Sequence, residues 1–123
     1  MIRKHMLNQS TPLDLAFQAL ADPTRRAMLE RLSREPASVS DLARPLAMSF
    51  PAVMQHLAVL EGAGLVTSRK VGRVRTCRIE ARALGRAQDW IAARRAEWDR
   101  RLDRLGDYLS ELKAKGDDDD RSP

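Results

Sequence analysis

The side chains with the most telling chemistry begin at Ser49. From there to His56 the chain offers hydrogen-bonding and small apolar groups at helical spacing, namely Ser49, Phe50, Ala52, Gln55 and His56. A glutamine amide can form two hydrogen bonds with the edge of an adenine, and Phe50 and Ala52 can meet the methyl group of a thymine. Phe50 could equally belong to the core or to a dimer contact. The pattern indicates a segment that reads base edges, with Gln55 as its main reader.

His56 stands beside an apolar leucine, which favours a phosphate contact or a structural hydrogen bond over a metal ligand.

Basic side chains follow at once, on both sides of a glycine. They are Arg69, Lys70, Arg73, Arg75 and Arg78. Guanidinium groups bind phosphate well because their planar fork of donors matches its oxygens. Successive residues of a strand point to opposite faces, so not all of these side chains can meet one partner. We expect Arg73 and Arg75, which lie nearest the tip, to contact phosphates or the minor groove.

A short helix must precede the segment that begins at Ser49. Ser38 followed by Asp41 is a variant capping box that opens a helix reaching toward Leu46. Pro45 stands late in this helix, where it can bend or shorten it.

The next helix, over residues 49–63, is the predicted recognition helix. Ser49 is a good cap for it, and the glycines at 62 and 64 can end it in the left-handed conformation. Val53, Leu57 and Leu60 recur at helical spacing and should face the core. Strands over residues 65–70 and 74–80 then form a basic wing over 65–80. This order predicts a winged helix-turn-helix, a mainly α fold with a small β-hairpin wing (α+β), and double-stranded DNA as the partner.

Helical patterns flank this centre on both sides. A first helix covers residues 13–20, and Asp22 with Pro23 opens a second one that Pro36 ends. One long helical pattern runs over residues 83–113, with an apolar residue every seventh position and a second apolar row in its C-terminal half. So long a helix cannot bury its apolar face on so small a domain, which favours a seam against a second copy. The residues of this seam are Leu84, Ile91, Trp98, Leu102, Leu105 and Leu109.

Charge supports the same interpretation. The chain of 123 residues carries 22 Lys and Arg against 17 Asp and Glu, for a net charge of +5. Four of the acids are consecutive, at 117–120, so the remainder is more basic than the total suggests. We expect residues 1–12 to be a flexible arm, 13–115 the winged helix-turn-helix domain with its dimerisation helix at 83–113, and 116–123 an acidic disordered tail.

Other classes of function find little support. The sequence has one cysteine, Cys77, and no Gly-rich phosphate loop or nucleophile–base constellation, so we predict no catalytic residues. A redox role for Cys77 is conceivable because arginines lie near it in sequence. The chain shows no signal-peptide pattern and no membrane-length apolar run, so we expect a cytoplasmic protein without membrane contact.

Several motifs together resemble the ArsR/SmtB family of bacterial winged-helix regulators. They are Asp-Pro-Thr-Arg-Arg at 22–26, Val-Ser-Asp-Leu-Ala at 39–43, and the run from Pro51 to Val66, which contains Gln-His-Leu and ends in Ala-Gly-Leu-Val. The resemblance covers about residues 13–80. It implies a homodimer that joins its first and last helices and represses transcription, often of its own operon, from an inverted-repeat operator. The first helix would bring Leu13 and Phe17 to the interface.

The final helix is similar to a branch of the family that does not sense metals. Metal-sensing members carry Cys-x-Cys on the helix before the recognition helix, where this chain has Val-Ser-Asp-Leu at 39–42, or ligands that include histidine on the last helix, where residues 83–113 have no histidine. We therefore expect no metal and no cofactor. Two alternatives stay open: a winged-helix module for protein interaction, and a repressor released by an unidentified organic effector.

Overall fold

A computed structural model describes residues 11–121 of the chain, with side chains as far as Gly116. The expected flexible arm over 1–12 falls almost wholly outside these described residues, and of the expected acidic tail over 116–123 the structure describes the backbone as far as Arg121 and no side chain beyond Gly116. The chain divides into two units after Ala87. We call residues 11–87 the head and residues 88–121 the distal helix, and we describe each by itself.

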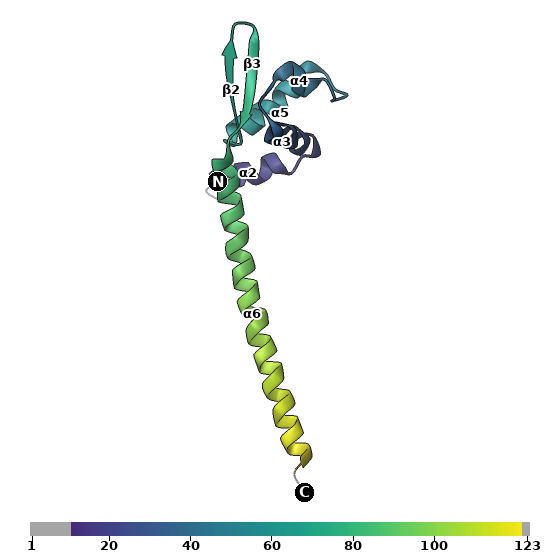
Figure 1. Ribbon diagram of the computed structural model, residues 1–123, viewed down its shortest axis with the longest axis vertical. Helices are drawn as coiled ribbons and strands as arrows, with labels where there is room; N and C mark the ends of the chain where they lie inside the picture. Colours follow the sequence, from purple (N-terminus) through teal and green to yellow (C-terminus); the bar gives the residue numbers. More distant parts are fainter. Residues whose placement is uncertain (1–10, 122–123) are drawn as a thin grey trace, which may run out of the picture. The chain divides into compact units, whose positions relative to one another are not determined.

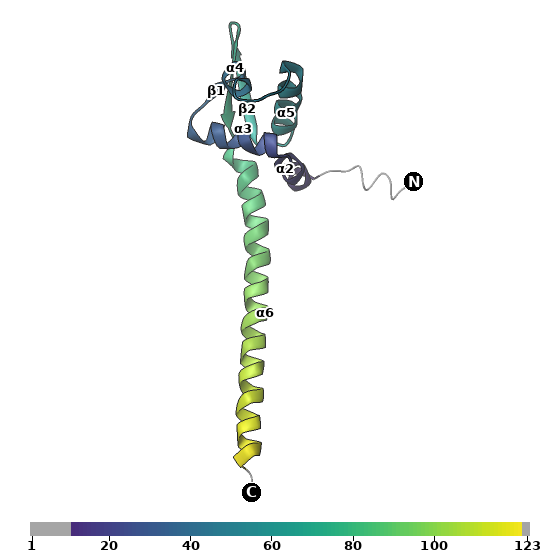
Figure 2. The same ribbon diagram turned by 90° about the vertical axis from the view of Figure 1, so that its right-hand side faces the viewer.

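The head contains all but one of the elements in full. In chain order they are α2 (Pro12–Leu20), α3 (Pro23–Arg34), β1 (Ala37–Ser38), α4 (Val39–Ala43), α5 (Phe50–Gly62), β2 (Val66–Val71) and β3 (Val74–Ile79), and the first turns of α6 (Ala81–Arg121) complete it. The structure confirms the predicted class, a mainly helical winged helix-turn-helix with a long C-terminal helix. Figure 1 shows the β2–β3 hairpin projecting beyond α3 and α4, and the view in Figure 2 agrees.

Side-chain caps set the starts of these helices. Asp22 accepts a hydrogen bond from the Arg25 backbone N–H (3.0 Å) at the start of α3, and Ser49 accepts one from the Ala52 N–H (3.3 Å) at the start of α5. Each cap satisfies a backbone donor that has no partner within its helix, and each is followed by a proline at the first or second helical position. These two predicted caps are confirmed, and so is Ser38, whose hydroxyl accepts from the Asp41 backbone N–H (3.0 Å) at the start of α4.

The sheet holds one strand that the sequence pattern does not reveal. It is three-stranded and antiparallel, in the order β1-β3-β2, with Ala37 opposite Cys77 and Ser38 opposite Thr76. β1 has only two residues, too few to show the alternation by which strands are recognised. Its pairing with β3 fixes the start of α4 against the base of the wing.

Two helices end elsewhere than the sequence pattern indicates. α4 stops at Ala43 instead of reaching Leu46. Arg44 still has helical φ and ψ and donates its N–H to the carbonyl of Ser40, but the proline at 45 has no N–H with which to continue the ladder. α6 begins at Ala81 and its backbone stays helical to Arg121, past the expected end at 113.

One core holds the head together. Its members come from α2, α3, α4, α5, the sheet and the start of α6, and the largest fully buried side chains are Met28, Leu42, Leu57, Leu60, Leu65, Val53, Val66 and Cys77. Val53, Leu57 and Leu60 are at most 1% exposed, as their helical spacing predicts. Gly64 and Gly72 have φ of +74° and +63°, which glycine adopts without strain, and they turn the chain after α5 and at the wing tip.

Candidate nucleic-acid interface

The recognition helix α5 has one face buried in the core and the opposite face exposed to solvent. Val53, Leu57 and Leu60 bury one side of it completely. At about 3.6 residues per turn, Gln55 lies on the far side of the helix from these three, and it is exposed. The core therefore holds the helix in one rotation about its axis, with the amide of Gln55 presented outward.

The other predicted base-contacting residues lie on or near the flanks of this helix. Phe50 is 56% exposed and shares a flank with Met54, on the side toward the wing. Ala52 and His56 are partly buried and lie on the opposite flank, from which His56 faces α3. Ser49 is exposed at the cap, although its hydroxyl already accepts the Ala52 N–H. The structure thus separates Gln55, Phe50 and His56 into three directions.

A groove of about 510 Å³ runs between α5 and the wing. Apolar side chains of Phe50, Met54 and Val74 line it, and the basic side chains that line it are Lys70, Arg73 and Arg75. Residues 38–40, at the start of α4, complete its wall. The groove therefore joins a basic strip to the recognition helix, a combination that suits a phosphate backbone running beside a base-contacting helix.

Arg75 is tied to the base of the wing. Its guanidinium donates to the Ser68 hydroxyl (2.9 Å), and that hydroxyl donates to the carboxylate of Glu61 near the end of α5. The side chain is partly buried, whereas Arg73 at the wing tip is exposed. Arg75 thus fastens the wing to α5 while it lines the groove, and Arg73 is the more accessible cation.

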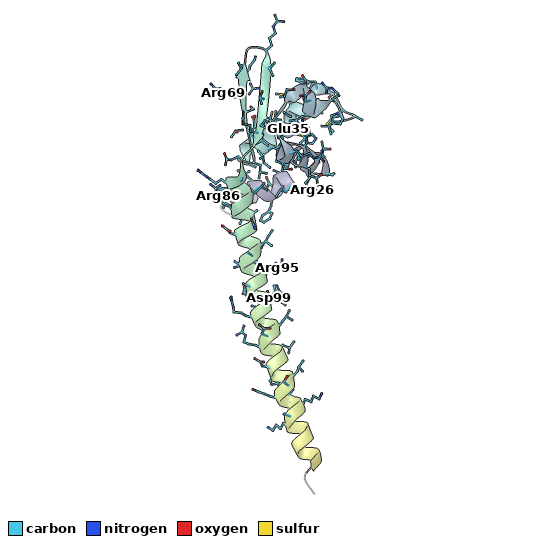
Figure 3. All side chains as sticks on the ribbon, in the orientation of Figure 1. Arg26, Glu35, Arg69, Arg86, Arg95 and Asp99 are labelled. Carbon is cyan, nitrogen blue, oxygen red and sulfur yellow. The ribbon has the colours of Figure 1, made fainter. Side chains whose placement is uncertain are left out.

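Lys70 is a groove residue that the sequence leaves ambiguous. It lies directly opposite Arg75 in the β2–β3 register, so both residues belong to the same face of the hairpin. Arg69 and Arg78 belong to the other face, and Figure 3 labels Arg69 on the hairpin. A turn placed at residues 72 and 73 would pair Lys70 with Arg75. This pairing could have been inferred from the sequence, and it would have assigned Lys70 to the groove.

His56 belongs to a polar cluster between α5 and the start of α3. Its Nδ1 lies 3.3 Å from a guanidinium nitrogen of Arg25 and 3.8 Å from a carboxylate oxygen of Asp22. The pKa of Asp22 is lowered, chiefly because its carboxylate accepts the Arg25 backbone N–H and further because the Arg25 guanidinium and His56 lie near it.

Cys77 is fully buried on β3. Burial raises the pKa of its thiol, the carboxylate of Glu61 raises it further, and the guanidinium of Arg75 acts in the opposite direction. Because the thiolate is the reactive form, this setting disfavours thiol chemistry at neutral pH.

The residues predicted for a dimer interface fall in both units. Leu13, Phe17 and Leu84 are partly buried in the head. On the distal helix, Ile91, Trp98, Leu102, Leu105 and Leu109 are between 46% and 61% exposed. Figure 3 shows side chains extending from this helix along its length, with Arg95 and Asp99 labelled about one turn apart.

Metal-ligating side chains do not converge in the described part of the chain, where no group of three or more His, Cys, Asp or Glu could hold an ion. Among the same described residues, no helix combines the length and the apolar character that a membrane span needs.

Comparison with known proteins gives concordant results. Residues 20–69 match the family described as a helix-turn-helix domain. The HTH-type transcriptional regulator Rv2034 of Mycobacterium tuberculosis is 44% identical over 106 residues, which cover 85% of this chain and 92% of that protein. A transcriptional repressor SmtB homolog of Synechocystis is 39% identical over 67 residues, 54% of this chain and 51% of the homolog. The crystal structure of an ArsR family transcriptional regulator, RHA00566, superimposes with a TM-score of 0.70 at 46% identity, covering 74% of this chain and 97% of that one.

Proposed function

Since this chain belongs to the ArsR/SmtB family of helix-turn-helix transcriptional regulators, which are DNA-binding proteins and not enzymes, we propose that it acts as a homodimeric repressor on an inverted-repeat operator. One observation carries the DNA-binding part of the proposal. The core fixes α5 so that Gln55 points outward, and a groove with Lys70, Arg73 and Arg75 lies beside the same helix. A base-reading group and a phosphate-binding strip are thereby held on one rigid head.

The proposed contacts divide by chemistry. Gln55 reads a base edge, with Phe50 and Ala52 available to thymine methyl groups. Lys70 and Arg73 bind phosphates, and Arg75 supports the wing from within the groove. Ser49, the N-cap of α5, lies near a DNA phosphate, because the positive end of the helix dipole is at this N-terminus.

Dimerisation follows from the exposed apolar surface of the distal helix. Large apolar side chains recur there seven residues apart at first and, from Trp98 onward, at intervals of four and three residues. All are about half exposed; they are Ile91, Trp98, Leu102, Leu105, Leu109 and Leu112. Exposed apolar rows of this length mark interaction sites in soluble proteins. We propose that a second copy covers this row, with Leu13, Phe17 and Leu84 of the head completing the interface. Two recognition helices would then reach successive major grooves, about 34 Å apart.

The test is a selection from a library of random duplexes, followed by fluorescence anisotropy of the selected duplex against a scrambled one across a salt series. A dimer that neutralises about four phosphates, two through Lys70 and Arg73 of each protomer, should show a slope near −4 in log affinity against log salt. Enrichment of an inverted repeat supports the proposal. Failure to enrich any sequence, with only weak binding to the starting library, would favour a protein-interaction module instead.

Matched variants separate the two kinds of contact. Lys70→Ala and Arg73→Ala should each weaken binding to both duplexes and reduce the salt slope by about two, because a homodimer carries each substitution twice. Arg78→Ala removes the same charge from the opposite face of the hairpin and should leave the slope unchanged. Gln55→Ala should lower the preference for the selected duplex instead. Equal losses of affinity for both duplexes in Gln55→Ala would contradict its role as base reader.

We also propose that this regulator belongs to the branch that does not sense metals, because residues 39–42 are Val-Ser-Asp-Leu and offer no paired thiolates. Zinc added to the protein–DNA complex should leave the anisotropy unchanged, and release of DNA by zinc would contradict this assignment.

A further inference from the structure

Arg25, in the first turn of α3, contacts two other helices, α2 and α5. Its Nε donates to the carbonyl oxygen of Ala19 (2.8 Å), and one terminal nitrogen donates to that of Gln18 (2.9 Å). The other terminal nitrogen lies 3.3 Å from Nδ1 of His56 on the recognition helix. One guanidinium on α3 thus joins the C-terminal end of α2 to the side of α5.

The contact with Arg25 depends on the tautomer of the histidine. A guanidinium has donors and no acceptor, so Nδ1 of His56 accepts from Arg25 in the tautomer that carries its ring proton on Nε2. Nδ1 faces Arg25 and the carboxylate of Asp22, and the side chain is only 22% exposed. His56 therefore lies in a different setting from Gln55, which is fully on the open side of the helix.

We infer that Arg25 is a positioning residue for DNA recognition, which sets the orientation of α5 by fastening His56 to the carbonyl end of α2. The inference rests on the proposed DNA-binding function, and it assigns His56 a structural role in place of a phosphate contact. The apolar core fixes the rotation of α5 through Val53, Leu57 and Leu60. The Arg25 contact adds a directional polar restraint on the flank that the core does not cover.

The physical reason lies in the shape of the guanidinium. Its diverging N–H groups can reach two carbonyl oxygens and a ring nitrogen together, because they lie in one rigid plane. A lysine keeps the positive charge but concentrates it at one atom, from which these three acceptors cannot all be reached. Arg25→Lys therefore removes the bridge without removing the charge.

The neighbouring arginine provides a matched control. Arg26 also donates to a carbonyl at the end of α2, that of Leu20 (2.7 Å), but its described contacts do not include α5. Arg26→Lys disturbs the same helix end by the same chemical change while leaving the link to His56 intact. Figure 3 labels Arg26 on the head.

A second matched pair addresses the histidine. The side-chain oxygen of an asparagine occupies about the place of Nδ1, so His56→Asn can still accept from Arg25. The amide of a glutamine reaches about the place of Nε2, so His56→Gln keeps a donor there but loses the acceptor near Arg25. The two variants therefore distinguish a positioning role from a direct phosphate contact.

The experiment measures the ratio of affinities for the selected and the scrambled duplex. Arg25→Lys and His56→Gln should each lower this ratio about tenfold, the loss expected for one charge-assisted hydrogen bond, and the double variant should lose little more than either one. Arg26→Lys should keep the ratio, and His56→Asn should keep most of it. Simple loss of folded protein weakens binding to both duplexes alike, so it leaves the ratio unchanged; circular dichroism measures it separately.

Two results would overturn the inference. One is an unchanged ratio in Arg25→Lys. The other is the reverse order of the histidine variants, with His56→Gln retaining recognition and His56→Asn losing it, which would make His56 a phosphate contact. Failure of the proposed function itself looks different, because the wild-type protein would then show no preference for any duplex.

Discussion

The head buries a core of large apolar side chains, whereas the distal helix exposes those that it carries. In the head, residues from all the helices and strands, including the start of α6, converge on one core, and Leu60 and Leu65 have no exposed surface. On the distal helix, every large apolar side chain that the structure describes is about half exposed, from Trp90 at 45% to Trp98 at 61%. The head can therefore hold its recognition surface by itself, whereas the distal helix has an apolar face that only another surface can cover.

Polar contacts follow the same division. In the head, Arg25, Arg75 and Ser68 connect different elements. On the distal helix, Arg94 lies over Trp90 (5.3 Å to the ring centre) and pairs with Glu97, and Arg101 lies over Trp98 (5.7 Å) and pairs with the same carboxylate. These pairs support the helix along its own surface, where each exposed ion pair contributes only a few tenths of a kcal/mol. They stabilise one element without joining it to a second.

The largest effect should come from the core of the head. Leu60→Ala should lower the free energy of unfolding by about 2–5 kcal/mol, because it deletes packed atoms at a site with no exposed surface. Urea unfolding followed by the amide signals of β2 and β3 measures this loss. Leu109→Ala, the same deletion on the distal helix, should change those signals far less at protein concentrations where the chain is monomeric. Equal losses in the two variants would remove the distinction between the units.

A charge on the apolar row tests the distal helix. Leu105→Asp should raise the dimer dissociation constant about a hundredfold, because a carboxylate would have to be buried in the proposed seam. Sedimentation equilibrium measures it. Ala93→Asp adds the same charge to an exposed position off the row and should have little effect. If the wild-type chain is monomeric at micromolar concentration, the interpretation of this face as a dimer seam is wrong.

Acid should weaken the head through Asp22. The pKa of this carboxyl is lowered in the folded protein, first because it accepts the Arg25 backbone N–H. A lowered pKa means that the ionised carboxylate stabilises the fold above the ordinary pKa of aspartate, about 3.9, and that this stabilisation is lost as the pH falls through the folded-state value. Asp22→Asn keeps a capping oxygen but removes the charge. Its urea midpoint should therefore fall less between pH 7 and pH 3 than that of the wild type, and parallel pH profiles would contradict this.

The smallest change concerns Cys77. Its burial and raised pKa predict slow reaction with a thiol reagent in the native protein at neutral pH and fast reaction in urea. Ellman's reagent measures both rates. Rapid, stoichiometric reaction of the folded protein would show that the base of the wing opens readily, and it would return a redox role to consideration.

Much of this architecture can be predicted from local signals. Asp22 with Pro23, and Ser49 with Pro51, mark helix starts because capping and proline chemistry depend on neighbouring residues alone. The spacing of Val53, Leu57 and Leu60 likewise defines the buried face of the recognition helix, and the order of helices and strands predicts the winged helix-turn-helix. β1 escapes prediction because two residues carry no periodicity, and its existence depends on the partner strand β3.

The site divides in the same manner. That Gln55 opposes the buried face of α5 follows from helical geometry, so the sequence itself determined the outward position of the main base reader. Which cations accompany it was decided by the hairpin register, which sets Lys70 and Arg75 on one face and Arg69 and Arg78 on the other. The roles of Arg25 and His56 were decided by tertiary structure alone, because 31 residues separate them along the chain. Periodicity and capping act over a few residues, whereas a contact between distant side chains exists only once the core has brought their helices together.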